Sequence, residues 1–326
     1  MRIGAAILTF ALVLSGCGDD PEPTNEASTD AKTKQEPLYV YSAYEDVDYL
    51  PALFREYTDA TGIVVVVRHR DDQQNLDDMM AKSGSQPADL LLTSSIASIW
   101  KAAEEGLLRP LPADSAALEM PGALRDPDGL WVAASVDPMV VLRQSASDAD
   151  VSYQSLGQAV APLCVSSSTL PANRTLLAWM MAATDARTTE FSVRRWMAAI
   201  QLPPREDYAD VIDALSSDAC REALLPMSAV PDERRSQVLA PPEVFFDIEG
   251  IGIGRHARSP DAAAALLDWF VSRPVQQKHA RATGRLPVTE PDAGLPGGSQ
   301  LSTRGIASAG FLYPDAVLLA ERARYR

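Results

Sequence analysis

Residues 88–100 read ADLLLTSSIASIW, where three leucines lead into Thr93, Ser94 and Ser95 and a helical apolar rhythm begins at Ile96. An apolar run that ends at small hydroxyl residues and turns at once into a helix is typical of a buried strand followed by a helix. The first amides of such a helix have no partner within the helix. Ser94 and Ser95 therefore either cap these amides or face a ligand.

The same alternation of strand and helix precedes this stretch twice. Residues 38–42 (LYVYS) and 63–68 (IVVVVR) read as strands, and the segments 47–61 and 76–81 have helical spacing. The β-branched run 63–68 predicts a strand that is buried on both faces. Three strand–helix units in a row predict an α/β lobe built on a parallel sheet.

Ligands of parallel sheets bind beyond the carboxyl ends of the strands. Three loops of this lobe begin there, at residues 42–44, 69–72 and 93–95. Ser94 and Ser95 therefore lie on a rim where a ligand is expected.

A second α/β unit begins where the strand 163–166 leads into Ser167, Ser168 and Thr169. These hydroxyl residues read as a helix cap or as an anion site at a helix N-terminus. Further helical segments are expected at 173–183, 190–200, 208–216, 260–271 and 275–283, and from Pro314, with strands at 130–135, 139–142, 223–225 and 244–248.

The N-terminal residues have the features of a targeting segment. Arg2 precedes an apolar run at 3–14, which is too short for a membrane span, and Leu14-Ser15-Gly16-Cys17 resembles the bacterial lipobox. The resemblance implies that residues 1–17 form a lipoprotein signal segment and that Cys17 carries lipid. Residues 18–37 are polar and read as a disordered tether of roughly 25 Å average span. The protein is thus expected on the periplasmic or cell-surface side of a bacterial membrane.

Composition excludes several classes of function. The 326 residues carry a formal net charge of −15, which argues against nucleic acid as a partner. No nucleophile elbow, HExxH motif or Ser/His/Asp order is visible, and three histidines supply few general bases. We expect a binding protein and no enzyme.

Four blocks carry a family resemblance: VYSAYEDVDYLPALFREYTDATGIVVVV (40–67), PADLLLTSSIASIWKAAEEGLLRPLP (87–112), LRDPDGLWVAASVDPMVVL (124–142) and DIEGIGIGRHARSPDAAAALLDWFVSRPVQQKHARATGRLPV (247–288). In this order they resemble the bacterial ferric-iron-binding proteins of ABC importers. The resemblance implies a two-lobed periplasmic binding protein of α/β class, with a ligand cleft and two crossing strands near 134–140 and 244–250. Closure of the cleft would be read by an inner-membrane ABC permease.

The implied division of the chain follows from the crossing strands. Residues 38–135 and 247–290 would form the first lobe, 136–246 the second lobe, and 291–326 a C-terminal helical segment.

The resemblance breaks at the ligand residues. Ferric-binding members usually place adjacent tyrosines after the strand that matches 223–225, where this chain has Met227 and Ser228. Some members use a glutamate in the loop that here holds Ser94 and Ser95. Others have an arginine in the first crossing segment, where Asp137 stands here. Fe(III) prefers anionic oxygen ligands, which serine and methionine replace poorly.

The candidate residues near the expected cleft are Tyr41, Tyr44, Ser94, Ser95, Asp137, Ser167, Ser168, Thr169, Tyr208, Ser228 and Glu249. Fe(III) is a possible ligand, and a rebuilt metal site would use Tyr44, Tyr208, Asp137 and Glu249. The same acids and aromatic rings suit an organic cation. A third interpretation is a degenerate binding module that acts as a sensor or interaction protein. We expect iron binding to be weak or absent.

Cys164 and Cys220 belong to strands that share one sheet of the second lobe in the resembled fold. The resemblance therefore implies that the two cysteines are close and can form a disulfide, which needs Cα atoms within about 7 Å.

Overall fold

The computed structural model describes residues 36–44, 48–81, 87–145, 150–158, 162–200 and 202–325. The expected signal segment 1–17 with Cys17, and the tether up to residue 35, lie outside the described residues. The helices are α1 (Tyr49–Thr61), α2 (Asp72–Met80), α3 (Ile96–Glu104), α4 (Pro171–Ala183), α5 (Ala186–Ala199), α6 (Tyr208–Ser216), α7 (Pro260–Phe270), α8 (Arg273–Thr283) and α9 (Ala307–Arg322), with short 3-10 helices η1 (Ala116–Glu119), η2 (Gly122–Leu124), η3 (Met227–Ala229), η4 (Asp232–Gln237) and η5 (Pro296–Gly298).

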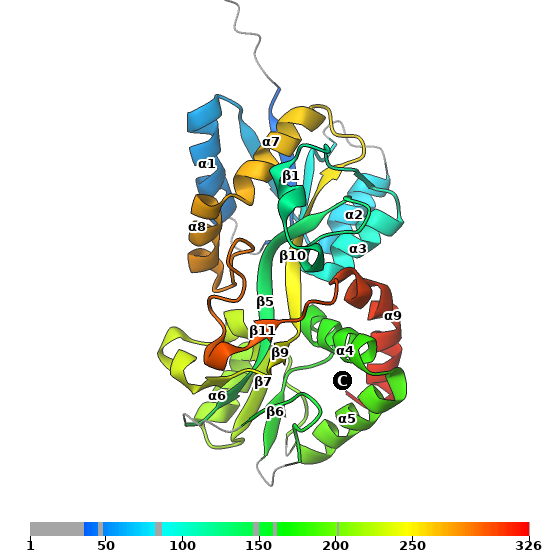
Figure 1. Ribbon diagram of the computed structural model, residues 1–326, viewed down its shortest axis with the longest axis vertical. Helices are drawn as coiled ribbons and strands as arrows, with labels where there is room; N and C mark the ends of the chain where they lie inside the picture. The colour runs from blue at the N-terminus through cyan, green and yellow to red at the C-terminus, as the bar shows by residue number, and fades with distance from the viewer. Residues whose placement is uncertain are drawn as a thin grey trace, which may run out of the picture. The chain divides into compact units, whose positions relative to one another are not determined.

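Among the described residues, the main sheet has nine strands in the order β2-β1-β3-β10-β5-β7-β6, with β4 against β10 and β8 against β5. The strands are β1 (Leu38–Ser42), β2 (Val65–His69), β3 (Leu90–Thr93), β4 (Leu108–Arg109), β5 (Val132–Arg143), β6 (Leu163–Val165), β7 (Glu222–Pro226), β8 (Val238–Leu239), β9 (Glu243–Val244), β10 (Phe246–Gly254) and β11 (Gln300–Leu301). β1, β2 and β3 are parallel, as the strand–helix alternation predicts. This parallel part and helices α1, α2, α3, α7 and α8 form the first lobe (Figure 1).

The prediction that the run 63–68 is buried on both faces is wrong. β2 is the last strand at one side of the sheet, and the side chains of Val64 and Val66 are 50% and 36% exposed. A β-branched run fits an extended backbone at the edge of a sheet as well as in its interior. The run therefore does not indicate whether the strand is an edge strand or a central strand.

Two long strands pass between the lobes. The expected strands 130–135 and 139–142 are one continuous strand, β5, which pairs with β10 from Val132 to Pro138 and with β7 from Met139 to Arg143. β10 also pairs with β3, so both strands join the first-lobe sheet to the second (Figure 1). The crossing strands therefore lie where the resemblance implies.

The second lobe contains β6, β7 and β8 with helices α4, α5 and α6. β6 is parallel to β7, and Cys164 and Cys220 are joined by a disulfide with their Cα atoms 5.8 Å apart. The disulfide belongs to a compact apolar cluster that includes Val140, Leu142 and Leu225.

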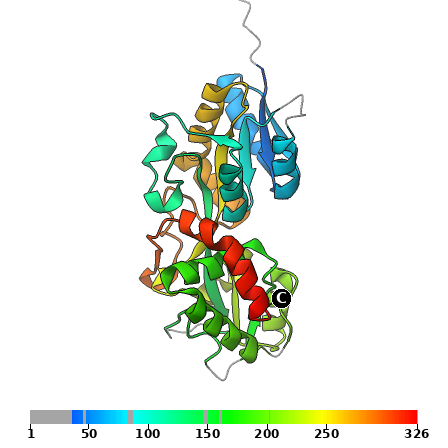
Figure 2. The same cartoon turned by 90° about the vertical axis from the view of Figure 1, so that its right-hand side faces the viewer.

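The C-terminal helix begins at Ala307, seven residues before the expected start at Pro314, which lies inside the helix. α9 packs on α4 and also reaches α3 of the first lobe (Figure 2). Gly310 lies so close to Trp100 that an added Cβ would be 2.8 Å from the indole ring, and Phe311 meets the same ring edge-on at 6.4 Å. Within the described ranges, no helix has the length and apolar character needed to cross a membrane.

Candidate functional site

The amides at the start of α3 are held by carboxylates of the protein itself. Ser94 donates from its backbone amide and from Oγ, at 2.7 Å, to Asp72 of α2. The Ile96 amide donates to Oδ1 of Asp247 at 3.0 Å. Ser95 occupies the N-cap position without a side-chain cap, and its Oγ lies 3.3 Å from Ser98 Oγ. Capping by Ser94 or Ser95 is therefore the wrong interpretation, because neither side chain caps α3 and Asp247 binds its first amide, that of Ile96.

Asp247 is a buried carboxyl on β10, only 3% exposed. Burial raises the pKa of Asp247 to about 6, although the amides of Ile96 and Ile248 donate hydrogen bonds that favour the charged form.

Asp137 lies on β5 and holds the loop that replaces the tyrosine pair. The Ser228 amide and Ser228 Oγ donate to its two carboxylate oxygens at 3.0 and 2.6 Å. The side chain of Ser228 is thereby committed to Asp137.

Glu249 is the centre of a second buried group. Its Oε2 accepts from Ser135 Oγ at 2.6 Å and lies 2.6 Å from His279 Nε2, while His279 Nδ1 lies 3.2 Å from the Tyr49 hydroxyl. Burial alone would raise the pKa of Glu249, but the charges of His279 and Arg285 and these hydrogen bonds lower it to about 2. Glu249 is therefore ionised at neutral pH.

Arg285 lies between these two groups. Its Nη2 is 3.7 Å from Asp137 Oδ2 and its Nε is 3.8 Å from Glu249 Oε1. Burial opposes the charged form, but Glu249, Asp137 and Asp247 raise the pKa of Arg285. Nη1 is buried and has no hydrogen-bond partner among the described residues.

Tyr208 and Tyr44 border the same region. Burial, followed by the charge of Asp137, raises the pKa of Tyr208 well above its ordinary value, and Arg285 acts in the opposite direction. The Tyr208 hydroxyl is buried and unpartnered within the described part of the chain. The Tyr44 ring lies 5.7 Å from Tyr49, and Tyr44 contributes to the field at Arg285.

The expected iron set therefore surrounds Arg285. Tyr44, Tyr208, Asp137 and Glu249 all interact electrostatically with its guanidinium. Among residues that the structure describes, no group of three or more His, Cys, Asp or Glu side chains is placed to hold a metal ion.

The hydroxyl residues before α4 do not cap it. Ser167 Oγ accepts from the amide and hydroxyl of Thr169, and Ser168 Oγ donates to the Tyr325 carbonyl at 2.5 Å. The N-cap of α4 is Leu170, which has no side-chain cap, so the cap interpretation is wrong. Within the described chain, no hydrogen bond joins Ser94 or Ser95 to this group or to Ser228.

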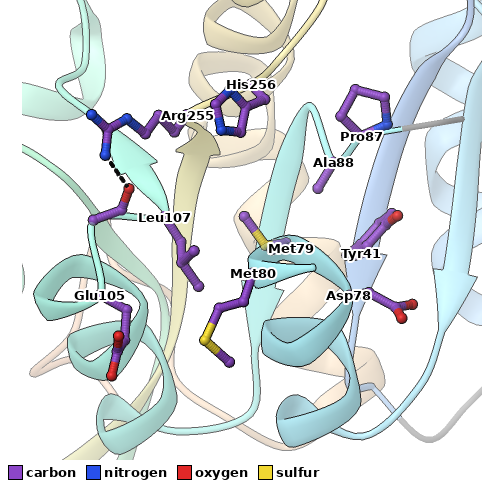
Figure 3. Close-up of a pocket in the computed structure, with 11 residues that line it drawn as sticks. Tyr41, Asp78, Met79, Met80, Pro87, Ala88, Glu105, Leu107, Arg255 and His256 are labelled. Atoms are coloured by element: carbon purple, nitrogen blue, oxygen red, sulfur yellow. Dashed lines mark hydrogen bonds between the residues drawn. The ribbon is translucent and has the colours of Figure 1, made fainter. Parts of the chain in front are cut away.

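Tyr41 belongs to a different place in the first lobe. It lines a cavity of about 570 Å³ whose wall contains no other candidate residue and is formed by Asp78, Met79, Met80, Pro87, Ala88, Glu105, Gly106, Leu107, Arg255 and His256. Figure 3 shows the two methionines between Tyr41 and Asp78 on one side and Glu105 and Leu107 on the other. The Tyr41 hydroxyl accepts a hydrogen bond from Arg68, whose guanidinium lies 4.8 Å from the centre of the Tyr41 ring.

Sequence reasoning missed Asp72, Asp247, His279 and Arg285. Asp247 had a visible signal, because an acid inside the apolar strand FDIEGIGIG needs a buried partner. Arg285 had none, since it follows a polar helix end in ATGRLPV.

Comparisons with known proteins extend these observations. No family model matches the chain. Iron uptake protein A1 of Synechocystis sp. is 23% identical over 98% of this chain and 92% of its own length. A Trichodesmium FutA protein solved with iron and citrate superposes with a TM-score of 0.78 at 20% identity, over 89% of this chain and all of that one. The Bordetella ferric binding protein gives the same TM-score at 22% identity, over 89% and 99% of the two chains.

The similarity runs through both lobes and the crossing strands. In sequence and in its two-lobed α/β fold, the chain therefore resembles the bacterial ferric-iron-binding periplasmic proteins.

Proposed function

We propose that the protein is an extracytoplasmic solute-binding protein of an ABC importer, anchored by lipid at Cys17. The observation that carries the proposal is the likeness to an iron uptake protein over 98% of the chain, together with a fold shared with solved ferric-binding proteins. A binding role agrees with the two crossing strands, about which lobes of this kind close on a ligand.

The candidate ligand site differs from an iron site that is built from tyrosinate ligands. Met227 and Ser228 replace the expected tyrosine pair, and Ser228 is bound to Asp137. Tyr208 is available, but burial and neighbouring acids oppose its ionisation unless a metal supplies the compensating charge. Fe(III) as cargo would have to displace Arg285 from Asp137 and Glu249. We therefore propose that bare Fe(III) is bound weakly or not at all.

An organic cation is disfavoured by the same contacts. Asp137 and Glu249 each lie within 4 Å of Arg285, so neither is a free counter-charge for an incoming ammonium group. The buried hydroxyl of Tyr208 and Nη1 of Arg285 instead favour a small solute that carries hydrogen-bond acceptors.

The test is a titration of the full chain, in mild detergent, with ferric nitrilotriacetate. A tyrosinate–iron site gives a visible charge-transfer band, and we expect no stoichiometric band. A stoichiometric band that is lost in Tyr44→Phe or Tyr208→Phe would show a rebuilt iron site and contradict the proposed change of ligand.

The alternative of a sensor or interaction module predicts a different result. A solute that binds only the folded protein at 100 times its Kd stabilises it by about 2.7 kcal/mol. Thermal unfolding across a panel of carboxylates, amino acids and sugars should therefore reveal at least one stabilising solute. No stabilisation by any of them would favour the interaction module.

A further inference from the structure

The backbone places Arg285 at the crossing strands. α8 ends at Gly284, which has a φ of +70° and terminates the helix in the left-handed region. Leu286 then exchanges both backbone hydrogen bonds with Val136 of β5, at 2.7 and 3.0 Å. Arg285 is fixed between this turn and this bridge, so its backbone position next to Asp137 is set by the fold.

The turn also touches the second lobe. A Cβ added at Gly284 would be 3.2 Å from the carbonyl oxygen of Ser228, and Arg235 donates to the Gly284 carbonyl at 3.4 Å. Arg285 therefore lies where the end of α8, the crossing strands and the Ser228 loop meet.

The charges around the guanidinium are arranged as a cation site. Asp137 comes from β5 and Glu249 from β10, and both side chains are 3% exposed, while Arg285 is 18% exposed. Asp247 adds negative potential at the same place. The basic groups that face Glu249 are Arg285 and the imidazole of His279 on α8. Two buried carboxylates without a counter-charge would bind a positive ion from solution or take up a proton.

We propose that Arg285 is the specificity-determining residue of the hinge: it occupies the Asp137–Glu249 pair as a built-in cation and so excludes metal ions and organic cations. The inference rests on the proposed solute-binding function and narrows it to solutes without net positive charge. The guanidinium of Arg285 provides the positive charge that a cationic ligand would otherwise provide to Asp137 and Glu249.

The experiment removes the guanidinium and returns it from solution. In Arg285→Ala, methylguanidinium chloride at millimolar concentration should bind at least tenfold more tightly than in the wild type, measured by calorimetry, and should raise the Tm. Arg285→Lys keeps the charge, so it should exclude the probe like the wild type. Arg273→Ala removes an exposed arginine of α8 that pairs with Glu290, and it should gain no binding.

A second variant guards against a folding defect. Arg285→Gln keeps most of the side-chain length, and MnCl₂ and methylguanidinium are titrated into it in parallel with the wild type.

If Arg285→Ala refolds only with methylguanidinium, and not with an equal concentration of NaCl, the exclusion role is supported. Failure to recover with the probe counts against it.

Two outcomes overturn the proposal. Either the wild type binds these cations as tightly as the neutral variants, or folded Arg285→Ala and Arg285→Gln gain no affinity for them. Both readings use methylguanidinium, which mimics the side chain, and Mn²⁺, a simple metal cation, so they need no natural ligand. They are therefore independent of the ferric titration and of any result on transport.

Discussion

Asp247 links the stability of the protein to pH at the scale of one residue. Its pKa is raised from 3.8 to about 6 by burial, so the folded state binds this proton more tightly than the unfolded state. The contribution of protonated Asp247 to the unfolding free energy is fully present at low pH. It is lost as the pH rises from about 4 to 6. At neutral pH the folded protein holds a buried charge at the start of α3.

Asp247→Asn should remove this dependence, because an amide still accepts from the Ile96 amide but does not ionise. Relative to the wild type, the variant should gain about 2 kcal/mol of unfolding free energy between pH 4.5 and pH 7. Urea unfolding at several pH values measures the difference. Asp77→Asn, at an exposed site on α2, is the matched control. Parallel pH profiles for Asp247→Asn and the wild type would contradict the assignment.

The acidic residues of the site were predictable and their partner was not. Asp137 and Glu249 were expected near the cleft because the family resemblance places them at the two crossing segments. Arg285 acquires its role only from the turn at Gly284 and the bridge from Leu286 to Val136, two contacts that join distant parts of the chain. The local sequence pattern identifies which residue is unusual. Contacts between distant parts of the chain determine which side chains surround it.

At the scale of elements, the disulfide ties β6 to the start of β7. It closes a loop that contains helices α4, α5 and α6, with a sequence separation of 56 residues. A crosslink of this size restricts the unfolded chain, which stabilises the folded state by about 4 kcal/mol in the chain-entropy model.

The double variant Cys164→Ser/Cys220→Ser should therefore lose about 4 kcal/mol of unfolding free energy in urea. Reduction of the wild type with dithiothreitol should cause a similar loss and should leave the double variant unchanged. Equal stability of reduced and oxidised wild type would show that the crosslink contributes nothing.

Strands and helices were predicted well where the residue spacing itself decides them. α6 occupies the expected residues 208–216, because Asp207 caps its start and its buried residues Val211, Ala214 and Leu215 have helical spacing. β5 was expected as two strands since Asp137-Pro138 reads as a turn, but Pro138 lies within the continuous crossing strand. The edge position of β2 depends on sheet order, which no single segment encodes.

At the scale of the molecule, α9 is one of the elements that connect the lobes outside the crossing strands. It contacts α3 through Gly310 and Phe311 and packs along α4, while the following Tyr325 carbonyl accepts from Ser168. Any movement of one lobe on the other must therefore slide or bend these contacts as well as β5 and β10. The limits of the lobes at 135, 246 and 290 stay a prediction.

The described chain enters its first strand at Leu38, directly after the polar segment 18–37 that follows Cys17. If Cys17 carries lipid, the binding lobes stay within reach of a permease while remaining free to take up solute. Cys17→Ser should then move the protein from the membrane fraction to the soluble fraction, or block its processing, as seen by immunoblot of separated fractions. Cys164→Ser/Cys220→Ser is the matched control, because it removes the other two cysteines and should leave fractionation unchanged. Unaltered processing and fractionation of Cys17→Ser would place the membrane attachment elsewhere and remove the lipid anchor from the proposed function.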